Sequence, residues 1–292
     1  DDGPRVLDCL EFDDDLRRDD VLADAAFLAM DLERLGRPDL AERFLDAYRR
    51  AAGDSWPASL AHHHVAYRAQ VRAKVSAVRA DQGDPDAAAG ARRLLSLARA
   101  HLEAGRVRLV VVGGLPGTGK STLARGLGDA IGAPVIRADV VRKELAGLSA
   151  DHSAAAPFGK GIYSAESSVA AYRELLSRAE AALAMGSTVV LDASWTDAAR
   201  RVEARRLAEA TVSDLIELRC VAPAEVVAER IAARAATGGD PSDADVETGH
   251  SMAAVADPWP EATPVDTVAA PGEIVRGALM IVNAKASRPA QA

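Results

Sequence analysis

The sequence predicts an α/β fold in which helices flank a parallel β-sheet, preceded by a mostly helical lobe. Three observations indicate this fold class. Up to about residue 104, apolar residues recur at helical spacing. After Gly105, short apolar runs alternate with helical patterns, which is typical of a parallel sheet whose connecting helices cover both faces. A glycine-rich loop follows the first of these runs, so we expect ligands at the carboxyl edge of the sheet.

Length and composition limit the number of domains, the kinds of binding surface and the compartment that we expect. A chain of 292 residues favours two domains, which we place at 1–104 and 105–292. The formal net charge of −8 and the pI of about 5.3 argue against a nonspecific nucleic-acid or anionic-membrane surface. Cys9 and Cys220 stand far apart, and we find neither a membrane-spanning run nor a signal peptide, so we expect a cytoplasmic protein without disulfides. Because the chain begins with Asp1 and not with methionine, we expect a fragment or a processed product.

The first 104 residues predict a helical bundle after one short strand at 4–12. Four helical patterns, most of them ended by glycine, are expected over 20–36, 39–53, 59–80 and 87–105. Three consecutive histidines, 62–64, lie in the third helix. Consecutive helix positions fan out by about 100°, so these rings cannot share one ligand-bearing face, and we expect an ordinary helix surface there.

The remaining residues predict five strands and the helices between them. Strands are expected over 107–114, 134–139, 187–194, 215–222 and 265–270. Helices are expected over 121–131, 140–147, 165–186, 223–236 and 271–285. The polar, glycine-rich stretch 237–245 directly follows a helix that carries arginines, and it predicts a mobile lid.

Residues 114–121 read GLPGTGKS, which has the spacing of the phosphate-binding loop. Glycines let backbone N–H groups converge on a polyphosphate, and the following helix directs its positive end at the same anion. Lys120 can reach the outer phosphates, while the Ser121 hydroxyl can join the shell of Mg²⁺. The rival dinucleotide motif needs a small residue three places after Gly119, where Thr122 stands, so it fails. The expected ATP ligands are Gly114, Pro116, Gly117, Thr118, Gly119, Lys120, Ser121 and Thr122.

Two carboxylates lie at the ends of predicted strands. Asp192 ends an apolar run and can hold Mg²⁺ together with Ser121, although a turn or helix-capping aspartate is the alternative. Asp139 and Arg142 form a D-x-x-R pair. The carboxylate can act as base toward an acceptor hydroxyl and the arginine can orient the acceptor, whereas the alternative is that Asp139 caps the helix after it.

Further candidates surround this edge. Arg230 and Arg234 lie four residues apart on one helix face and can stabilise charge on a transferred phosphoryl group, with a solvated face as an equal alternative. The segment 159–166 can wall an acceptor site through Lys160 and Tyr163, although a surface loop is the favoured interpretation of both.

The motifs GGLPGTGKSTLA, RADVVRKEL, GIYS, VVLDASW and DPSDAD lie between residues 108 and 268. They resemble the P-loop small-molecule kinase-like domain at the C-terminus of bacterial two-domain proteins whose first domain is aminoglycoside phosphotransferase-like. The stretch LDCLEFDDDLRRDDVLADAAFLAMDL resembles the final part of that first domain, and the excess of arginine over lysine is typical of high-GC bacterial genomes. Asp8 matches a metal-binding aspartate of that domain. The lobe and catalytic loop that should precede Asp8 are missing from this sequence, so we expect residues 1–104 not to catalyse alone.

Together, the motifs and the resemblance imply an ATP- and Mg²⁺-dependent kinase acting on a hydroxyl of a small metabolite. A polynucleotide 5′-hydroxyl kinase is one alternative, because D-x-x-R suits that chemistry too. The acidic charge and the lack of a basic stripe with interleaved aromatics argue against it. A nucleotide-gated regulatory ATPase is the other alternative, and slow hydrolysis without an acceptor would favour it.

Overall fold

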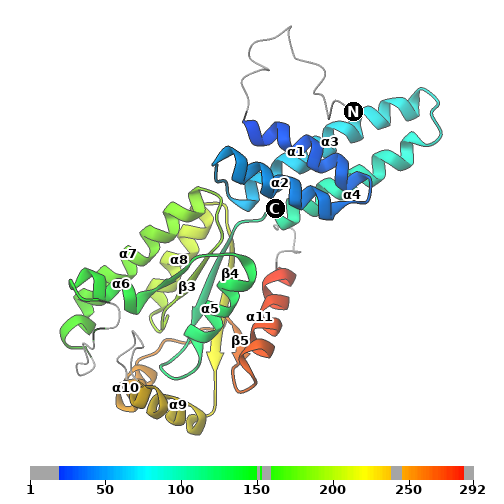
Figure 1. Ribbon diagram of the computed structural model, residues 1–292. Helices are drawn as coiled ribbons and strands as arrows, with labels where there is room; N and C mark the ends of the chain where they lie inside the picture. The colour runs from blue at the N-terminus through cyan, green and yellow to red at the C-terminus, as the bar shows by residue number, and fades with distance from the viewer. Residues whose placement is uncertain (1–19, 150–151, 153–158, 238–244, 286–292) are drawn as a thin grey trace. The chain divides into compact units, whose positions relative to one another are not determined.

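The computed structural model describes residues 20–149, 152, 159–237 and 245–285 (Figure 1). The strand expected at 4–12, with Asp8 and Cys9, lies outside these ranges, as does nearly all of the expected lid. Backbone contacts divide the chain into two compact units, Asp1–Gly105 and Arg106–Ala292.

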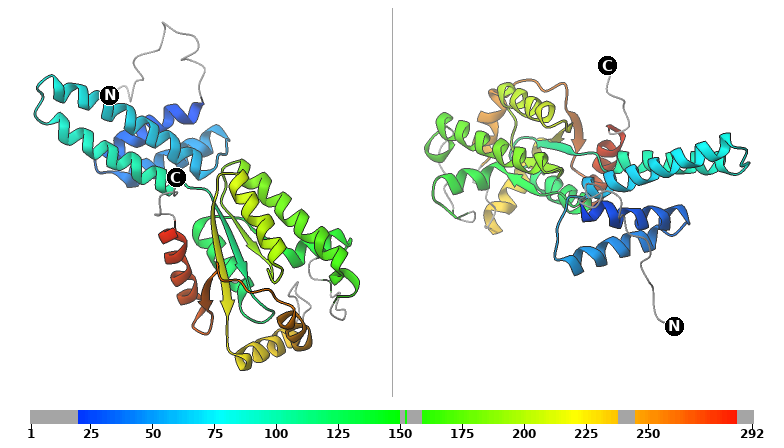
Figure 2. Two further views of the ribbon diagram at one scale, coloured as in Figure 1. Left: turned by 180° about the vertical axis from the view of Figure 1, so that it is seen from behind. Right: turned by 90° about the horizontal axis from the view of Figure 1, so that it is seen from above.

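The first unit is a bundle of helices with a core of small side chains. Its helices are α1 (Val21–Arg34), α2 (Pro38–Ala52), α3 (Ala58–Asp81) and α4 (Ala87–Ala104). The long helices α3 and α4 pack along each other, and α1 packs against α2 and α3 (Figure 2). Alanines dominate the core, which lets the helices approach closely. The buried residues are Ala26, Ala29, Met30, Ala41, Val65, Ala66, Ala69, Ala73, Leu94 and Ala98.

The histidine run of α3 is only partly a surface feature. His62 is half-buried, and its Nδ1 lies 2.9 Å from Nδ1 of His101 on α4. The Nε2 of His101 lies 2.8 Å from Oε2 of Glu33 on α1. His63 is exposed, as expected for the helix surface, but that expectation is wrong for His62, because its ring faces the neighbouring helix.

The second unit contains the expected parallel sheet. Its strands are β1 (Arg108–Gly113), β2 (Val135–Arg137), β3 (Val189–Asp192), β4 (Asp214–Val221) and β5 (Thr263–Asp266). They run in the order β2-β3-β1-β4-β5, and every pairing is parallel. The loop with the glycine motif leaves the central strand, β1, so it lies at the middle of the carboxyl edge.

Helices cover both faces of this sheet. They are α5 (Lys120–Ile131), α6 (Ala138–Leu145), α7 (Ala165–Ala184), α8 (Ala198–Ala210), α9 (Ala224–Thr237), α10 (Val246–Ala254) and α11 (Pro271–Lys285), with a 3₁₀ turn at Gly161–Tyr163. In β1, Leu109 and Val111 pack with α6, α7 and α8, whereas Val110 and Val112 pack with α5 and α11. Successive side chains of β1 thus point to opposite faces of the sheet, and helices cover each face, which gives three layers: helices, sheet, helices.

Two boundaries differ from the sequence expectations. β2 ends at Arg137 and α6 begins at Ala138, with Arg137 as its N-cap. Asp139 therefore lies in the first turn of α6, and the expectation that it ends a strand, like the alternative that it caps the helix, is wrong. β5 begins at Thr263, two residues before the expected start.

The sequence analysis missed α8 and α10. In α8 the buried positions include Arg201, Ala204, Leu207 and Ala208, a stripe too weakly apolar to stand out. Arg201 is tolerated there because its Nη1 and Nη2 each donate a hydrogen bond of 2.7 Å, to the carbonyl oxygens of Trp195 and Pro258. Within the described ranges, no helix is both long and apolar enough to cross a membrane.

Candidate active site at the carboxyl edge of the sheet

The loop from β1 to α5 has the backbone that a bound polyphosphate requires. Gly117 and Gly119 adopt left-handed φ values of 79° and 84°, which glycine reaches without steric cost. A Cβ on Gly117 would also lie 2.9 Å from the carbonyl oxygen of Val227 on α9, so a larger residue would push the loop away from that helix. Gly119 is the N-cap of α5, which leaves the N–H groups of the first turn available to an anion.

Lys120 begins α5 and is 8% exposed. It makes no hydrogen bond or ion pair with the residues that the structure describes. A desolvated ammonium without a counter-ion is unfavourable, and an anion beside it would remove that cost. The nearby thiol of Cys220 does not serve as one, because burial raises its pKa to about 12 despite the charge of Lys120. Ser121 and Thr122 follow in the same turn, with Ser121 half-buried and Thr122 exposed.

Asp192 ends β3 and is 3% exposed. Its Oδ2 accepts a hydrogen bond of 3.1 Å from Nε of Arg137. Its Oδ1 is buried and accepts no hydrogen bond from the described residues. A buried carboxylate oxygen without a donor is suited to a cation. No cluster of three or more His, Cys, Asp or Glu side chains suited to a metal ion occurs in the described ranges, so a cation here would need hydroxyl, phosphate or water oxygens as its other ligands.

A cavity of about 440 Å³ adjoins the phosphate loop. Lys120 lines it from the loop, and Asp139 and Arg142 line it from α6. With Pro116, which also lines it, the structure brings four predicted site residues around one space. The other predicted site residues do not line it: Gly114, Gly117, Thr118, Gly119, Ser121, Thr122, Asp192, Arg230 and Arg234.

Asp139 and Arg142 form an ion pair at the cavity. Nη1 of Arg142 donates a hydrogen bond of 2.8 Å to Oδ1 of Asp139. The guanidinium lies over the ring of Tyr163, 4.9 Å from its centroid, which is a favourable cation–π geometry. Tyr163 also lines the cavity, whereas Lys160 is exposed and does not. Nε of Arg142 is buried and donates to nothing in the described part of the chain.

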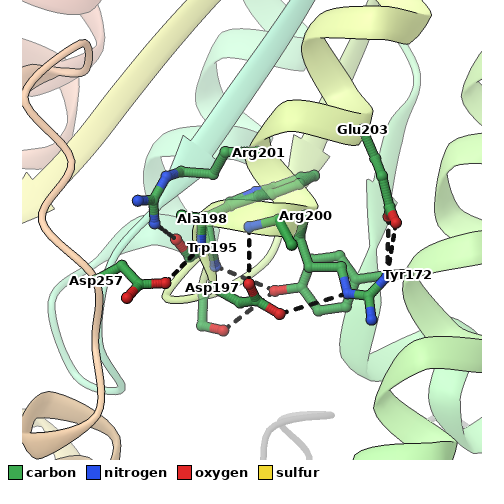
Figure 3. A network of polar contacts seen from close by, with 10 residues as sticks. Tyr172, Trp195, Asp197, Ala198, Arg200, Arg201, Glu203 and Asp257 are labelled. Atoms are coloured by element: carbon green, nitrogen blue, oxygen red, sulfur yellow. Dashed lines mark hydrogen bonds and ion pairs between the residues drawn. The ribbon is translucent and has the colours of Figure 1, made fainter.

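A second D-x-x-R pair, which the sequence analysis missed, lines the same cavity. Asp197 is the N-cap of α8 and accepts from the backbone N–H of Ala199 at 2.8 Å. Oδ2 of Asp197 lies 3.7 Å from Nε of Arg200, whose Nη1 contacts both carboxylate oxygens of Glu203 at 2.9 and 3.0 Å (Figure 3). Both Asp197 and Arg200 face the cavity. A signal was present in the sequence, because the D-x-x-R spacing of residues 139–142 recurs at residues 197–200. The second copy lies at the start of α8, the helix after β3, which neighbours β2 in the sheet.

Buried Tyr172 holds the segment between Asp192, at the end of β3, and Asp197, at the start of α8. The Tyr172 hydroxyl accepts from the backbone N–H of Trp195 at 3.1 Å and lies 3.2 Å from Oγ of Ser194 (Figure 3). Burial raises the pKa of Tyr172, so its proton stays available for hydrogen bonding. Trp195 has φ 55°, which is strained for a bulky residue, and these contacts help to hold it there.

Arg230 of α9 is connected to the phosphate loop through Thr267. Arg230 donates to the backbone oxygen of Thr267 at 2.6 Å and to its hydroxyl at 3.2 Å. That hydroxyl donates to the carbonyl oxygen of Thr118 at 2.7 Å. Arg230 therefore supports the loop through Thr267, while Arg234, one turn further along α9, is half-buried.

The chain matches one protein-family model and is similar to mycobacterial proteins. A family model described as "AAA domain" matches residues 109–259. The chain is 49% identical over 264 residues to "Uncharacterized protein Rv2004c" of Mycobacterium tuberculosis and equally to "Uncharacterized protein Mb2027c" of Mycobacterium bovis. Each match covers 90% of this chain and 52% of the relative, so the chain spans about half the length of these relatives.

Solved structures with a similar arrangement include two kinases. A sugar kinase from Janibacter matches with a TM-score of 0.44 and 21% identity, covering 62% of this chain and 99% of that one. A gluconokinase from Sinorhizobium meliloti matches with a TM-score of 0.43 and 23% identity, covering 62% and 93%.

Proposed function

Because the chain belongs to the AAA domain family, we propose that it is a phosphotransferase that moves the γ-phosphate of ATP to a hydroxyl of a small metabolite. The observation that carries this proposal is the meeting of Lys120 with the Asp139–Arg142 pair around one cavity. A phosphate-binding cation and a carboxylate able to accept a proton are the two groups that hydroxyl phosphorylation requires.

ATP binds, in this proposal, with its phosphates against the loop of residues 114–122. The left-handed glycines and the N-terminus of α5 supply backbone donors, and Lys120 supplies the charge. Lys120 is buried and makes no ion pair with the described residues, which supports this assignment, since the phosphates compensate the ammonium.

Asp192 and Ser121 would hold Mg²⁺ beside those phosphates. The donor-free Oδ1 of Asp192 is the observation that supports this. Mg²⁺ bound there would neutralise charge on the phosphate oxygens. Arg137, paired with the other oxygen of Asp192, would keep the carboxylate oriented.

Asp139 takes the proton of the acceptor hydroxyl. The acceptor oxygen forms a bond to the γ-phosphorus, the bond from that phosphorus to the bridging oxygen breaks, and ADP leaves with that electron pair. Arg142 holds Oδ1 of Asp139, which leaves Oδ2 to accept the proton. Arg142 also lies close enough to orient the acceptor, because both residues line the cavity. Arg230 acts through Thr267 on the loop, and Arg234 remains a candidate for contact with the nucleotide.

The size of the cavity favours a small acceptor. Its volume of about 440 Å³ lies within the usual range for small-molecule sites, about 300–1,000 Å³. The proposal concerns the α/β unit. For residues 1–104 we retain the proposal, from sequence resemblance, that they form the C-terminal part of an aminoglycoside phosphotransferase-like domain.

A screen of metabolite hydroxyls for acceptor-stimulated ADP release tests the function. We expect stimulation by a subset of small molecules, abolished in Lys120→Ala and retained in Arg125→Ala, which removes an exposed cation from the same helix. Stimulation by 5′-hydroxyl oligonucleotides alone would favour the polynucleotide kinase. Slow hydrolysis indifferent to every acceptor would favour the regulatory ATPase.

A further inference from the structure

We propose that the acceptor carries an anionic group, a carboxylate or a phosphate, and that Arg200 binds it. This inference rests on the proposed function, because it concerns the substrate of the same cavity. It assigns the second D-x-x-R pair to recognition of the acceptor and leaves the first pair to the reacting hydroxyl.

The donors of Arg200 are only partly used. Glu203 contacts Nη1 alone, and Asp197 lies 3.7 Å from Nε, beyond a good hydrogen bond. Nε and Nη2 therefore have no hydrogen-bond acceptor among the described residues. This pair of N–H groups is an edge of the guanidinium that matches the two oxygens of a carboxylate or phosphate.

Arg200 is also fixed in place and poorly solvated. Its side chain is 18% exposed, and carboxylates flank it at two positions of its own helix, Asp197 and Glu203. A guanidinium held in this way loses little conformational entropy when it binds an anion. The low exposure strengthens the interaction with that anion relative to one in water.

Each aspartate of the two D-x-x-R pairs has one carboxylate oxygen engaged in a hydrogen bond. Oδ1 of Asp139 accepts from Arg142, and Oδ1 of Asp197 accepts from the backbone at the start of α8. In contrast, Nε of Arg142 is buried without an acceptor in the described part of the chain, within a side chain that is 10% exposed. Nε of Arg142, like Nε and Nη2 of Arg200, is thus a guanidinium donor that an anionic acceptor would satisfy, whereas Oδ2 of each aspartate stays open to a hydroxyl of the acceptor.

Four probes that share one polyol chain separate the possible acceptor classes: D-gluconate, glucitol 6-phosphate, glucitol and glucamine. Their binding to the full chain is measured calorimetrically at fixed ionic strength, with Mg²⁺ and a non-hydrolysable ATP analogue present. We expect gluconate or glucitol 6-phosphate to bind at least about tenfold more tightly than glucitol, the usual effect of one charge-assisted hydrogen bond. Glucamine should bind most weakly. The better of the two anions identifies the carboxylate or the phosphate as the recognised group.

Variants of α8 assign the effect to Arg200. In Arg200→Gln the preference for the anion over glucitol should fall by about tenfold, while glucitol binding and ATP binding stay unchanged. Arg200→Lys should recover part of the preference for the anion, since lysine restores the positive charge but not the planar pair of donors. Arg206→Gln is the matched control, because Arg206 is exposed on the same helix and does not line the cavity. Anions that bind no better than glucitol, tighter binding of glucamine, or equal losses in the Arg200 and Arg206 variants would overturn the inference.

The same probes distinguish this inference from the proposed function. Arg200-dependent anion binding without phosphorylation of any acceptor would leave the anion site standing and remove the kinase. Lys120-dependent phosphorylation of neutral or cationic acceptors alone would support the kinase and exclude the anion site.

Discussion

Lys120 is the residue on which the proposed reaction most depends. Lys120→Ala should abolish phosphoryl transfer, since it removes the charge that stabilises the transferred group. Because the buried ammonium has no counter-ion among the described residues, the variant without nucleotide should be at least as thermally stable as the unaltered chain. Melting temperature and ADP release, each with and without ATP, check both parts. A loss of stability with normal turnover would contradict the assignment.

Asp139 can be tested separately from ATP binding. Asp139→Asn removes the proton acceptor, so transfer should fall by on the order of 10²–10⁴, the usual effect of general-base catalysis. The amide oxygen can still accept from Nη1 of Arg142, so the loss of charge in this mostly buried pair should cost about 1–3 kcal/mol of stability. ATP affinity should change little. Asp129→Asn, on the exposed face of α5, is the control, and full activity of Asp139→Asn would exclude the base role.

Thr267 connects Arg230 to the phosphate loop. Thr267→Val keeps the shape but deprives the carbonyl oxygen of Thr118 of its donor, which should cost about 1–3 kcal/mol of stability. The loop should also loosen, so ATP affinity should fall. Calorimetric ATP titration and thermal unfolding measure the two effects. Unchanged ATP affinity would show that this hydrogen bond does not shape the nucleotide site.

Local spacing in the sequence identifies candidate site residues but not the partners that the structure gives them. The phosphate loop and D-x-x-R at 139–142 are contained in short windows, so the sequence analysis found them. Thr267 lies 149 residues from Thr118, and nothing in the sequence links the two. The pairing of Arg137 with Asp192 likewise arises only because β2 and β3 are neighbours in the sheet.

At the scale of elements, strong periodicity and clear end signals decided what could be predicted. The helix expected at 271–285 has those bounds in the structure, because Pro271 begins it and its apolar face is continuous. α8 was missed since its buried stripe consists of alanines, one leucine and one arginine. β2 was drawn too long because the three-residue strand runs directly into α6, and no glycine or proline separates them.

The contact between α3 and α4 predicts a pH dependence. Burial, and then the charge of His101, lower the pKa of His62, although Glu33 opposes this. The unfolded chain binds a proton near the ordinary pKa of 6.5, so it holds more protons than the folded chain below that pH. Stability of the helical unit should therefore fall as the pH drops below about 6.5. Hydrogen exchange of α3 and α4 amides in the full chain, from pH 7.5 to 5.5, measures it.

Two variants assign this dependence. His62→Gln removes the titrating group and should flatten the pH profile, whereas His63→Gln, at an exposed position of the same helix, should leave it unchanged. A profile that is equally steep in both variants would contradict the role of His62.

At the scale of the whole molecule, the two units have separate hydrophobic cores. The core of the helical unit draws on residues between 26 and 98, and both cores of the α/β unit draw on residues after 106. Chain length and the change of periodicity in the sequence predict a division at 104.

A chain of residues 106–292 should therefore fold by itself and bind ATP with the affinity of the full chain. Circular dichroism and ATP titration of this fragment, beside the full chain, provide the measurement. A fragment that is insoluble unless residues 1–105 are expressed with it would show that the helical unit completes the fold.

The central claim is that the γ-phosphate of ATP passes to a small acceptor. The most direct measurement incubates the full chain with Mg²⁺, γ-³²P-labelled ATP and a fractionated mixture of small metabolites, to which 5′-hydroxyl oligonucleotides are added, and then locates the label by chromatography. We expect the label in a small organic phosphate, with none formed by Lys120→Ala and normal formation by Arg125→Ala. Label that appears only as inorganic phosphate, or only on oligonucleotide 5′ ends, would contradict the account.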